Sequence, residues 1–218
     1  MTRLLIVGAT GLVGSLVLDQ ALADKRISQV IALTRRPIAP RDKLENVVID
    51  FSDMPDQAAW WSVDGVVSAL GTTLATAETR SAYRAVDYDY PLAIARHARD
   101  YGATHFALTS SLGADPRSPF VYTRTKGELE SELKKLGFPS LTIVRPSVLD
   151  GDREQQRPDE RTAKFLFRVL APVLPRRLRI SPANAVAASL IHGAIAAPPG
   201  VHLKYNEDMR EAARIARV

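Results

Sequence analysis

The hydrophobic residues of positions 1–148 gather in short continuous runs, separated by stretches in which apolar residues recur at helical spacing. Continuous apolar runs, rather than alternating ones, are typical of strands buried on both faces of a parallel sheet. Because helical segments lie between the runs, the pattern predicts an α/β fold, a doubly wound parallel sheet with helices on both faces. The runs that predict strands are residues 3–9, 28–34, 47–50, 65–70, 104–110 and 140–146.

The intervening helices differ in how clearly they are bounded. A helix is expected over residues 82–102, or two helices broken near Pro91, because proline interrupts helical hydrogen bonding. A C-terminal helix is expected with Asn206 as its cap. The other segments that predict helices are residues 12–24, 123–137, 182–200 and 206–218.

The regular alternation of strands and helices ends after Pro146, where polar and charged residues dominate. We expect a single domain over residues 1–218, with residues 150–182 as a small C-terminal substrate-binding lobe. This lobe is expected over the carboxyl ends of the strands, where open α/β sheets bind their ligands.

Three glycines, spaced three apart, follow the first predicted strand and open the first predicted helix. Glycine allows a tight turn and brings backbone N–H groups close to a pyrophosphate, which the positive end of a helix also favours. A tight turn without a ligand is the alternative. The pattern predicts dinucleotide binding by Gly8, Ala9, Thr10, Gly11, Leu12, Val13 and Gly14.

The end of the second predicted strand decides which dinucleotide is expected. An acidic residue there would bind the ribose hydroxyls of NAD, but this chain has Arg35 and Arg36. A guanidinium suits the extra 2′-phosphate through charge-assisted hydrogen bonds. We therefore predict NADP(H) as the cofactor, the alternative being two surface arginines without this role.

Tyr122 and Lys126 lie four residues apart. Tyr122 stands at the start of the helix predicted over 123–137, so the two side chains are expected on one face of that helix. A phenol is a poor acid near neutrality, with a reference pKa of about 10, and a nearby ammonium favours its ionised form. Ser110 and Ser111 close the fifth predicted strand and can hold a substrate carbonyl. The alternative is a helix-start tyrosine with a solvated lysine.

The motifs GATGLVG, SS…YxxxK and VRPSVL, in that order, resemble the short-chain dehydrogenase/reductase superfamily in its extended or atypical branch. The stretches SSLGAD…FVYTRTKGELE and RPSVLDGDREQQRPDE are similar to the Tat-interacting-protein-like group of NADP-binding reductases. The resemblance implies a Rossmann-type sheet. It also implies that Tyr122 is the general acid/base, that Lys126 holds the nicotinamide ribose, and that Ser111, with Ser110 as second choice, orients the carbonyl.

The same resemblance implies further contacts with the cofactor. Asp50 and Phe51 would flank the adenine, and Pro146 and Val148 would bound the nicotinamide pocket. The adjoining ribose and phosphates would lie over Ala69, Leu70 and Gly71. One departure stands out, because relatives often carry an asparagine where this chain has Asp87, which argues against a proton relay through an asparagine.

Together these features predict an NADP(H)-dependent oxidoreductase that transfers hydride between nicotinamide and a carbonyl or alcohol substrate. An NADP(H)-binding regulatory or redox-sensing protein with little turnover is the alternative, since the resembled group includes regulatory members. A sugar-nucleotide epimerase-like enzyme comes third, because the small lobe leaves little room for a nucleotide sugar.

Composition excludes several other classes. The chain has no cysteine, and its four histidines are scattered, so we expect no disulfide and no metal site. The net charge of +5 is modest and spread out, so no nucleic-acid partner is expected. No apolar stretch reaches the ~18 residues that a membrane span needs. We expect a cytoplasmic monomer or homodimer that acts on a small molecule.

Overall fold

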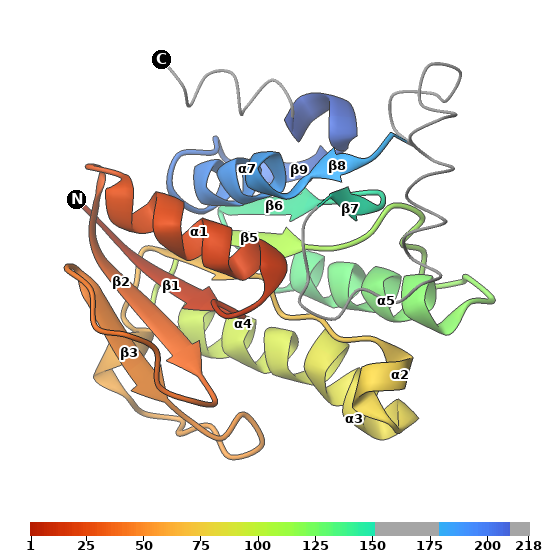
Figure 1. Cartoon of the computed structure of the whole chain (residues 1–218), viewed down its shortest axis with the longest axis horizontal. Coiled ribbons are helices and arrows are strands. Elements are labelled where there is room, and N and C mark those ends of the chain that lie inside the picture. Colours follow the sequence, from red (N-terminus) through yellow and green to blue (C-terminus); the bar gives the residue numbers. More distant parts are fainter. Residues whose placement is uncertain (151–178, 210–218) are drawn as a thin grey trace.

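The computed structural model describes residues 1–150 and 179–209. Its central seven-stranded sheet lies between two layers of helices (Figure 1). Every neighbouring pair of its strands is parallel, and the strand order is β3-β2-β1-β4-β5-β6-β9. The predicted α/β, doubly wound, Rossmann-type fold is therefore confirmed. The strands are β1 (Thr2–Val7), β2 (Ile27–Thr34), β3 (Leu44–Val48), β4 (Gly65–Ser68), β5 (His105–Thr109), β6 (Ser140–Val144) and β9 (Gly200–Lys204).

The strand order reverses between β1 and β4. From β1 the chain proceeds to β2 and β3 on one side, then crosses to β4 and continues outward on the other side. Loops that leave the carboxyl ends of β1 and β4 therefore diverge, and this switch point is where doubly wound sheets bind their ligands.

Successive residues of the strands alternate between two hydrophobic cores. Leu4 and Ile6 of β1 pack toward one layer of helices, and Leu5 and Val7 pack toward the other. Figure 1 shows α1 (Leu12–Ala23) beside α7 (Ala183–Ile195) on the first face. The second face is covered by α4 (Tyr90–Asp100) and α5 (Val121–Lys135). Burial on both faces explains why the strand residues form continuous apolar runs.

Two edge strands differ from the prediction. The third strand spans Leu44–Val48 rather than 47–50, and β9 lies where the sequence predicted only the end of a helix and a loop. Edge strands pair on one side and are partly exposed, so polar residues such as Glu45 and Lys204 occur within them. A search for continuous apolar runs therefore misplaces β3 and misses β9.

The helical segment expected over 82–102 continues past Pro91 without a break. It runs from α3 (Arg80–Arg84) through a π-helical turn, Ala85–Asp89, directly into α4, so of the two alternatives the single helix is closer to the structure. A further short helix, α2 (Leu74–Ala77), was not predicted. Single π-helical turns inside helices frequently mark functional sites.

Most of the expected substrate lobe, residues 151–178, lies outside the described residues, as does 210–218 of the expected C-terminal helix. The ends of the lobe meet where β7 (Leu149–Asp150) pairs with β8 (Ser181–Pro182). Asn206 does not precede the helical turn 206–209 but forms part of it, and its side-chain amide donates to the Arg179 carbonyl at 2.7 Å. It thus holds two chain segments together.

Candidate functional site

The glycine loop after β1 and the loop after β4 meet at the switch point. Gly8 has a φ of +82°, and a Cβ on it would lie 2.6 Å from the carbonyl carbon of Ala69 and 2.8 Å from the Leu70 nitrogen. The Ala69 N–H donates to the Val7 carbonyl at 2.9 Å. Only glycine can turn here at such close range, so the structure brings two of the predicted cofactor segments together.

The start of α1 is open to an anion. Its N-cap is Gly11, which offers no side-chain cap, and its first turn carries no acidic residue. A Cβ on Gly14 would overlap the Gly8 carbonyl oxygen, which shows how closely the helix approaches the strand end. The side chains of Ala9 and Val13 are buried in the core, so the contacts expected of them with a cofactor are backbone contacts. These features fit a diphosphate at the helix N-terminus.

The residues expected near the adenosine follow β2 and β3. Arg35 and Arg36 are exposed, and neither forms an ion pair with another residue in the described part of the chain. Asp50 is exposed, and its carboxylate accepts hydrogen bonds from Ser52, which lower the pKa of that carboxyl. Phe51 is only 7% exposed and its ring packs 5.7 Å from that of Tyr90, so its side chain belongs mainly to the core.

Tyr122 and Lys126 both lie on α5, one turn apart, as predicted. Tyr122 is 43% exposed, whereas the Lys126 side chain is 4% exposed. The Lys126 ammonium forms an ion pair of 2.8 Å with Asp87 of the π-helical turn. A Cβ on Gly71 would lie 3.9 Å from the Lys126 Nζ, so the loop after β4 covers this pair. The structure thus connects the predicted catalytic helix to the switch point.

A second tyrosine, Tyr83 of α3, is buried close to this pair. Burial raises the pKa of Tyr83, and the nearby Asp87 and Tyr122 raise it further. The phenol of Tyr83 therefore keeps its proton throughout the neutral range. Its side chain is 1% exposed and belongs to the core.

The two candidate serines have different surroundings. The Ser110 hydroxyl donates to the Glu130 carboxylate at 2.5 Å, and Glu130 also accepts hydrogen bonds from Arg145. The hydrogen bond to Glu130 raises the pKa of the Arg145 guanidinium. The Ser111 hydroxyl donates to the neighbouring Leu112 carbonyl at 3.1 Å. Ser110 is thus tied into a buried network, and Ser111 is not part of it.

The loops after β5 and β6 also meet. The Leu112 N–H donates to the Pro146 carbonyl at 2.8 Å, and the Ser181 N–H donates to the Val148 carbonyl at 2.8 Å. Pro146 is buried, and its carbonyl joins the loop after β6 to the loop that carries Ser111.

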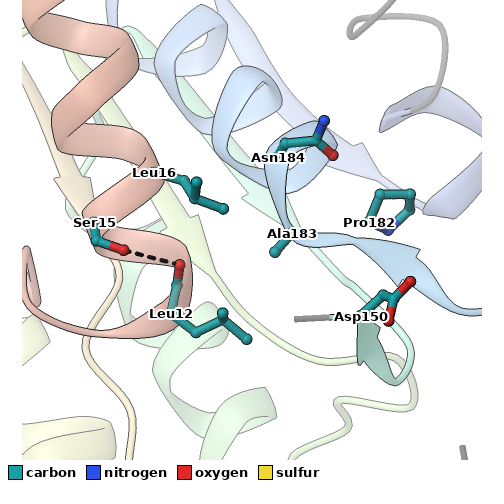
Figure 2. A pocket seen from close by; sticks show the side chains of 7 residues that line it. All are labelled: Leu12, Ser15, Leu16, Asp150, Pro182, Ala183 and Asn184. Carbon is teal, nitrogen blue, oxygen red and sulfur yellow. Dashed lines mark hydrogen bonds between the residues drawn. The ribbon is translucent and has the colours of Figure 1, made fainter. Parts of the chain in front are cut away.

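A cavity of about 390 Å³ lies beside this site, between the start of α1 and the start of α7 (Figure 2). Leu12 is the one predicted cofactor residue in its lining, and none of Ser111, Tyr122 and Lys126 contributes to it. In Figure 2 the Leu12 and Leu16 side chains point from α1 toward Ala183 across the cavity. Its lining residues are Leu12, Ser15, Leu16, Asp150, Pro182, Ala183 and Asn184.

Two features of the site were missed from the sequence, namely the Lys126–Asp87 pair and the network around Glu130. Glu130 follows Tyr122 and Lys126 at a further four-residue interval, so helical spacing alone could have placed it on their face. No signal in the sequence pairs it with Arg145. Within residues 1–150 and 179–209, no cluster of His, Asp and Glu could hold a metal ion, and no helix is long and apolar enough to cross a membrane.

Comparison with known proteins identifies the family. A family model described as NAD(P)H-binding matches residues 8–165. The chain belongs to the NAD(P)H-binding family. It is 36% identical over 186 residues to "Protein fmp52, mitochondrial" of Emericella nidulans, covering 79% of this chain and 78% of the relative. It is also 36% identical over 167 residues to "Protein HTATIP2" of Rattus norvegicus, covering 74% and 69%. The predicted membership of the atypical short-chain dehydrogenase/reductases is thereby confirmed.

Solved structures share the fold of this NAD(P)H-binding protein. "MoeE5 in complex with UDP-glucose and NAD" has a TM-score of 0.69 at 17% identity, covering 98% of this chain and 81% of that one. At this identity the likeness establishes the Rossmann fold alone. The coarse functional expectation, a protein of an NAD(P)-binding, oxidoreductase-like family, is confirmed by the family match.

The expected cytoplasmic location is wrong. The relatives from Emericella nidulans, Aspergillus niger, Aspergillus fumigatus and Candida albicans are all named mitochondrial. The expectation relied on the absence of cysteine and of an apolar stretch long enough to span a membrane. Neither property distinguishes one reducing compartment from another, so composition could not decide the location.

Proposed function

We propose that this protein is an NADP(H)-dependent oxidoreductase that transfers hydride between nicotinamide and a small carbonyl or alcohol substrate. The observation that carries the proposal is the position of Tyr122 and Lys126. A partly exposed phenol lies one helical turn from a buried ammonium, which in turn lies under the loop at the switch point of the sheet. General acid catalysis needs a phenol that substrate can reach and a fixed cation near it.

The preference for NADP(H) over NAD(H) is supported by the arginines after β2. Arg35 and Arg36 are exposed and have no carboxylate partner among the described residues, so their guanidinium groups remain free to bind a 2′-phosphate. The uncapped start of α1 and the close approach at Gly8 and Gly14 suit the diphosphate common to both cofactors.

In the reduction direction, the hydride that the carbonyl carbon receives would come from the bound cofactor. Tyr122 donates its phenolic proton to the carbonyl oxygen, which completes the alcohol. Ser111 is the better candidate to hold that oxygen by a hydrogen bond, because the Ser110 hydroxyl is already engaged with Glu130. Lys126 supplies a fixed positive charge beside the phenol.

The Tyr122→Phe variant tests the proposal. It removes the proton donor, so turnover of an accepted aldehyde or ketone should fall at least ~100-fold. The affinity for NADPH, measured by calorimetry, should stay within about threefold, since the phenol is not expected to hold the diphosphate. Tyr101→Phe is the matched control, because Tyr101 lies at the far end of α4 and donates to the Asp56 carbonyl.

Undiminished turnover in Tyr122→Phe would reject the assigned role. Tight NADPH binding by the unaltered protein, with no turnover of any aldehyde, ketone or quinone in a panel, would instead favour the regulatory or redox-sensing alternative. Tighter binding of NADH than of NADPH would reject the cofactor preference.

A further inference from the structure

The ion pair between Asp87 and Lys126 is unusual for its burial. The side chains are 1% and 4% exposed, respectively, and the Oδ1–Nζ distance is 2.8 Å. Removing two ions from water costs several kcal/mol each, and a buried pair in place of apolar residues rarely adds net stability. The pair therefore requires an explanation other than stabilisation of the fold.

The local structure holds Asp87 in place for this contact. It lies in the π-helical turn between α3 and α4, and that turn buries Asp87 while Asp89, two residues later, stays exposed. The other oxygen, Oδ2, accepts a hydrogen bond of 2.7 Å from the Thr72 N–H. Both oxygens are thus directed, one to the loop after β4 and one to α5.

The pair is part of the predicted site. A Cβ on Gly71, a predicted cofactor-binding residue, would lie 3.7 Å from Asp87 Oδ1 and 3.9 Å from Lys126 Nζ. The titratable groups around Asp87 are Lys126 from α5 and Tyr83 from α3, and Tyr83 also interacts electrostatically with Tyr122. The exposed pair Arg84–Glu128 joins the same two elements at 2.8 Å, away from the buried side.

We propose that Asp87 is a positioning residue for the reaction: its carboxylate orients the Lys126 ammonium beneath the β4 loop and balances its charge. This inference rests on the proposed function for its kinetic consequence, but the orientation of the ammonium stands independently of turnover. Asp87 is enclosed, its Oδ1 is ion-paired with the Lys126 ammonium and its Oδ2 accepts from the Thr72 N–H, so its carboxylate acts as a fixed counter-charge.

The Asp87→Asn variant isolates the charge. The amide keeps an oxygen that can accept from the Thr72 N–H, but Lys126 loses its counter-ion. A charged group buried without a counter-ion is disfavoured relative to its neutral form. The alkaline limb of the kcat/KM profile should therefore move at least about one pH unit toward neutrality.

Asp89→Asn is the matched control, because it removes a carboxylate from the same turn without touching Lys126. Its kcat/KM profile should coincide with that of the unaltered protein. A purely structural role of Asp87 would lower the melting temperature but leave the pH profile of the surviving activity unchanged, and that result would overturn the proposal.

A readout without turnover separates this inference from the proposed function. In lysine-selective NMR, a buried, ion-paired ammonium exchanges its protons slowly and gives a signal at neutral pH. That signal should be absent in Lys126→Met, retained in Asp89→Asn and lost or strongly shifted in Asp87→Asn. If it behaves in this way but no substrate is turned over, the orientation by Asp87 stands and the proposed function fails.

If Asp87→Asn is too unstable for these assays, the stability of a double variant still tests the proposal. The double variant Asp87→Asn/Lys126→Met contains no buried unpaired ion, so it should melt at a higher temperature than Asp87→Asn alone. An unaltered protein that shows no protected lysine ammonium signal, or a signal that is the same in Asp87→Asn, would overturn the proposal.

Discussion

Replacing Gly14 by alanine tests the close approach between α1 and the end of β1. A Cβ there would overlap the Gly8 carbonyl oxygen and lie 2.6 Å from its carbonyl carbon, whereas carbon atoms pack at about 3.5 Å or more. The start of α1 must therefore move by about 1 Å relative to Gly8. This movement disturbs the buried contacts of Val13 and Val17 with the sheet.

The magnitude follows from two opposing effects. Overpacking against a rigid backbone carbonyl costs about 3 kcal/mol, the upper end of the usual range. Alanine in place of glycine in a helix recovers about 1 kcal/mol. The net loss of about 2 kcal/mol lowers the melting temperature by about 4–8 °C for a chain of this length. NADPH affinity should also fall, because the displaced helix carries the amides that face the diphosphate.

Gly11→Ala is the informative control for Gly14→Ala. Gly11 has φ −83° and ψ 170°, which alanine adopts, and its Cβ would meet only the Gly8 carbonyl oxygen at 3.4 Å. Its melting temperature should change by less than about 3 °C, while a methyl group at the helix start weakens NADPH binding at least ~10-fold. Thermal unfolding and calorimetry measure both quantities. An unchanged melting temperature in Gly14→Ala, or unchanged NADPH affinity in Gly11→Ala, would refute the reasoning.

Three further predictions concern the cofactor preference, the buried network and alkaline stability. Joint replacement of Arg35 and Arg36 by alanine should weaken NADPH binding at least ~10-fold and leave NADH binding within about twofold, and calorimetry showing equal losses for both would contradict this. Glu130→Gln leaves the half-buried Arg145 guanidinium without a counter-ion and should cost about 3 kcal/mol in urea unfolding, whereas Glu132→Gln, which breaks an exposed pair, should cost under about 0.5 kcal/mol. Burial, and then a nearby carboxylate, raises the pKa of Tyr83 above 10.0. The folded state therefore loses stability as the pH rises past 10.0, and the melting temperature of Tyr83→Phe should fall less steeply there; parallel curves would refute it.

Local patterns in the sequence determined most of the strands of this protein and part of its candidate site. Continuous apolar runs located the six strands β1 to β6, with the bounds of the partly exposed β3 misplaced. The spacing of Gly8, Gly11 and Gly14 predicted the turn into α1, and the four-residue interval placed Tyr122 and Lys126 on one helical face. Each of these depends on neighbours within a few residues, where backbone geometry and side-chain periodicity decide the outcome.

Only the tertiary structure decided which distant residues meet. Asp87 and Lys126 are 39 positions apart, with α4 and β5 between them, and Glu130 meets Arg145, 15 positions further on, because α5 packs against β6. The edge strand β9 forms through its pairing with β6, and its own short, largely exposed residues do not reveal that pairing. Pairings of this kind arise from the closure of the whole sheet and its helices, and no periodicity along the chain encodes them.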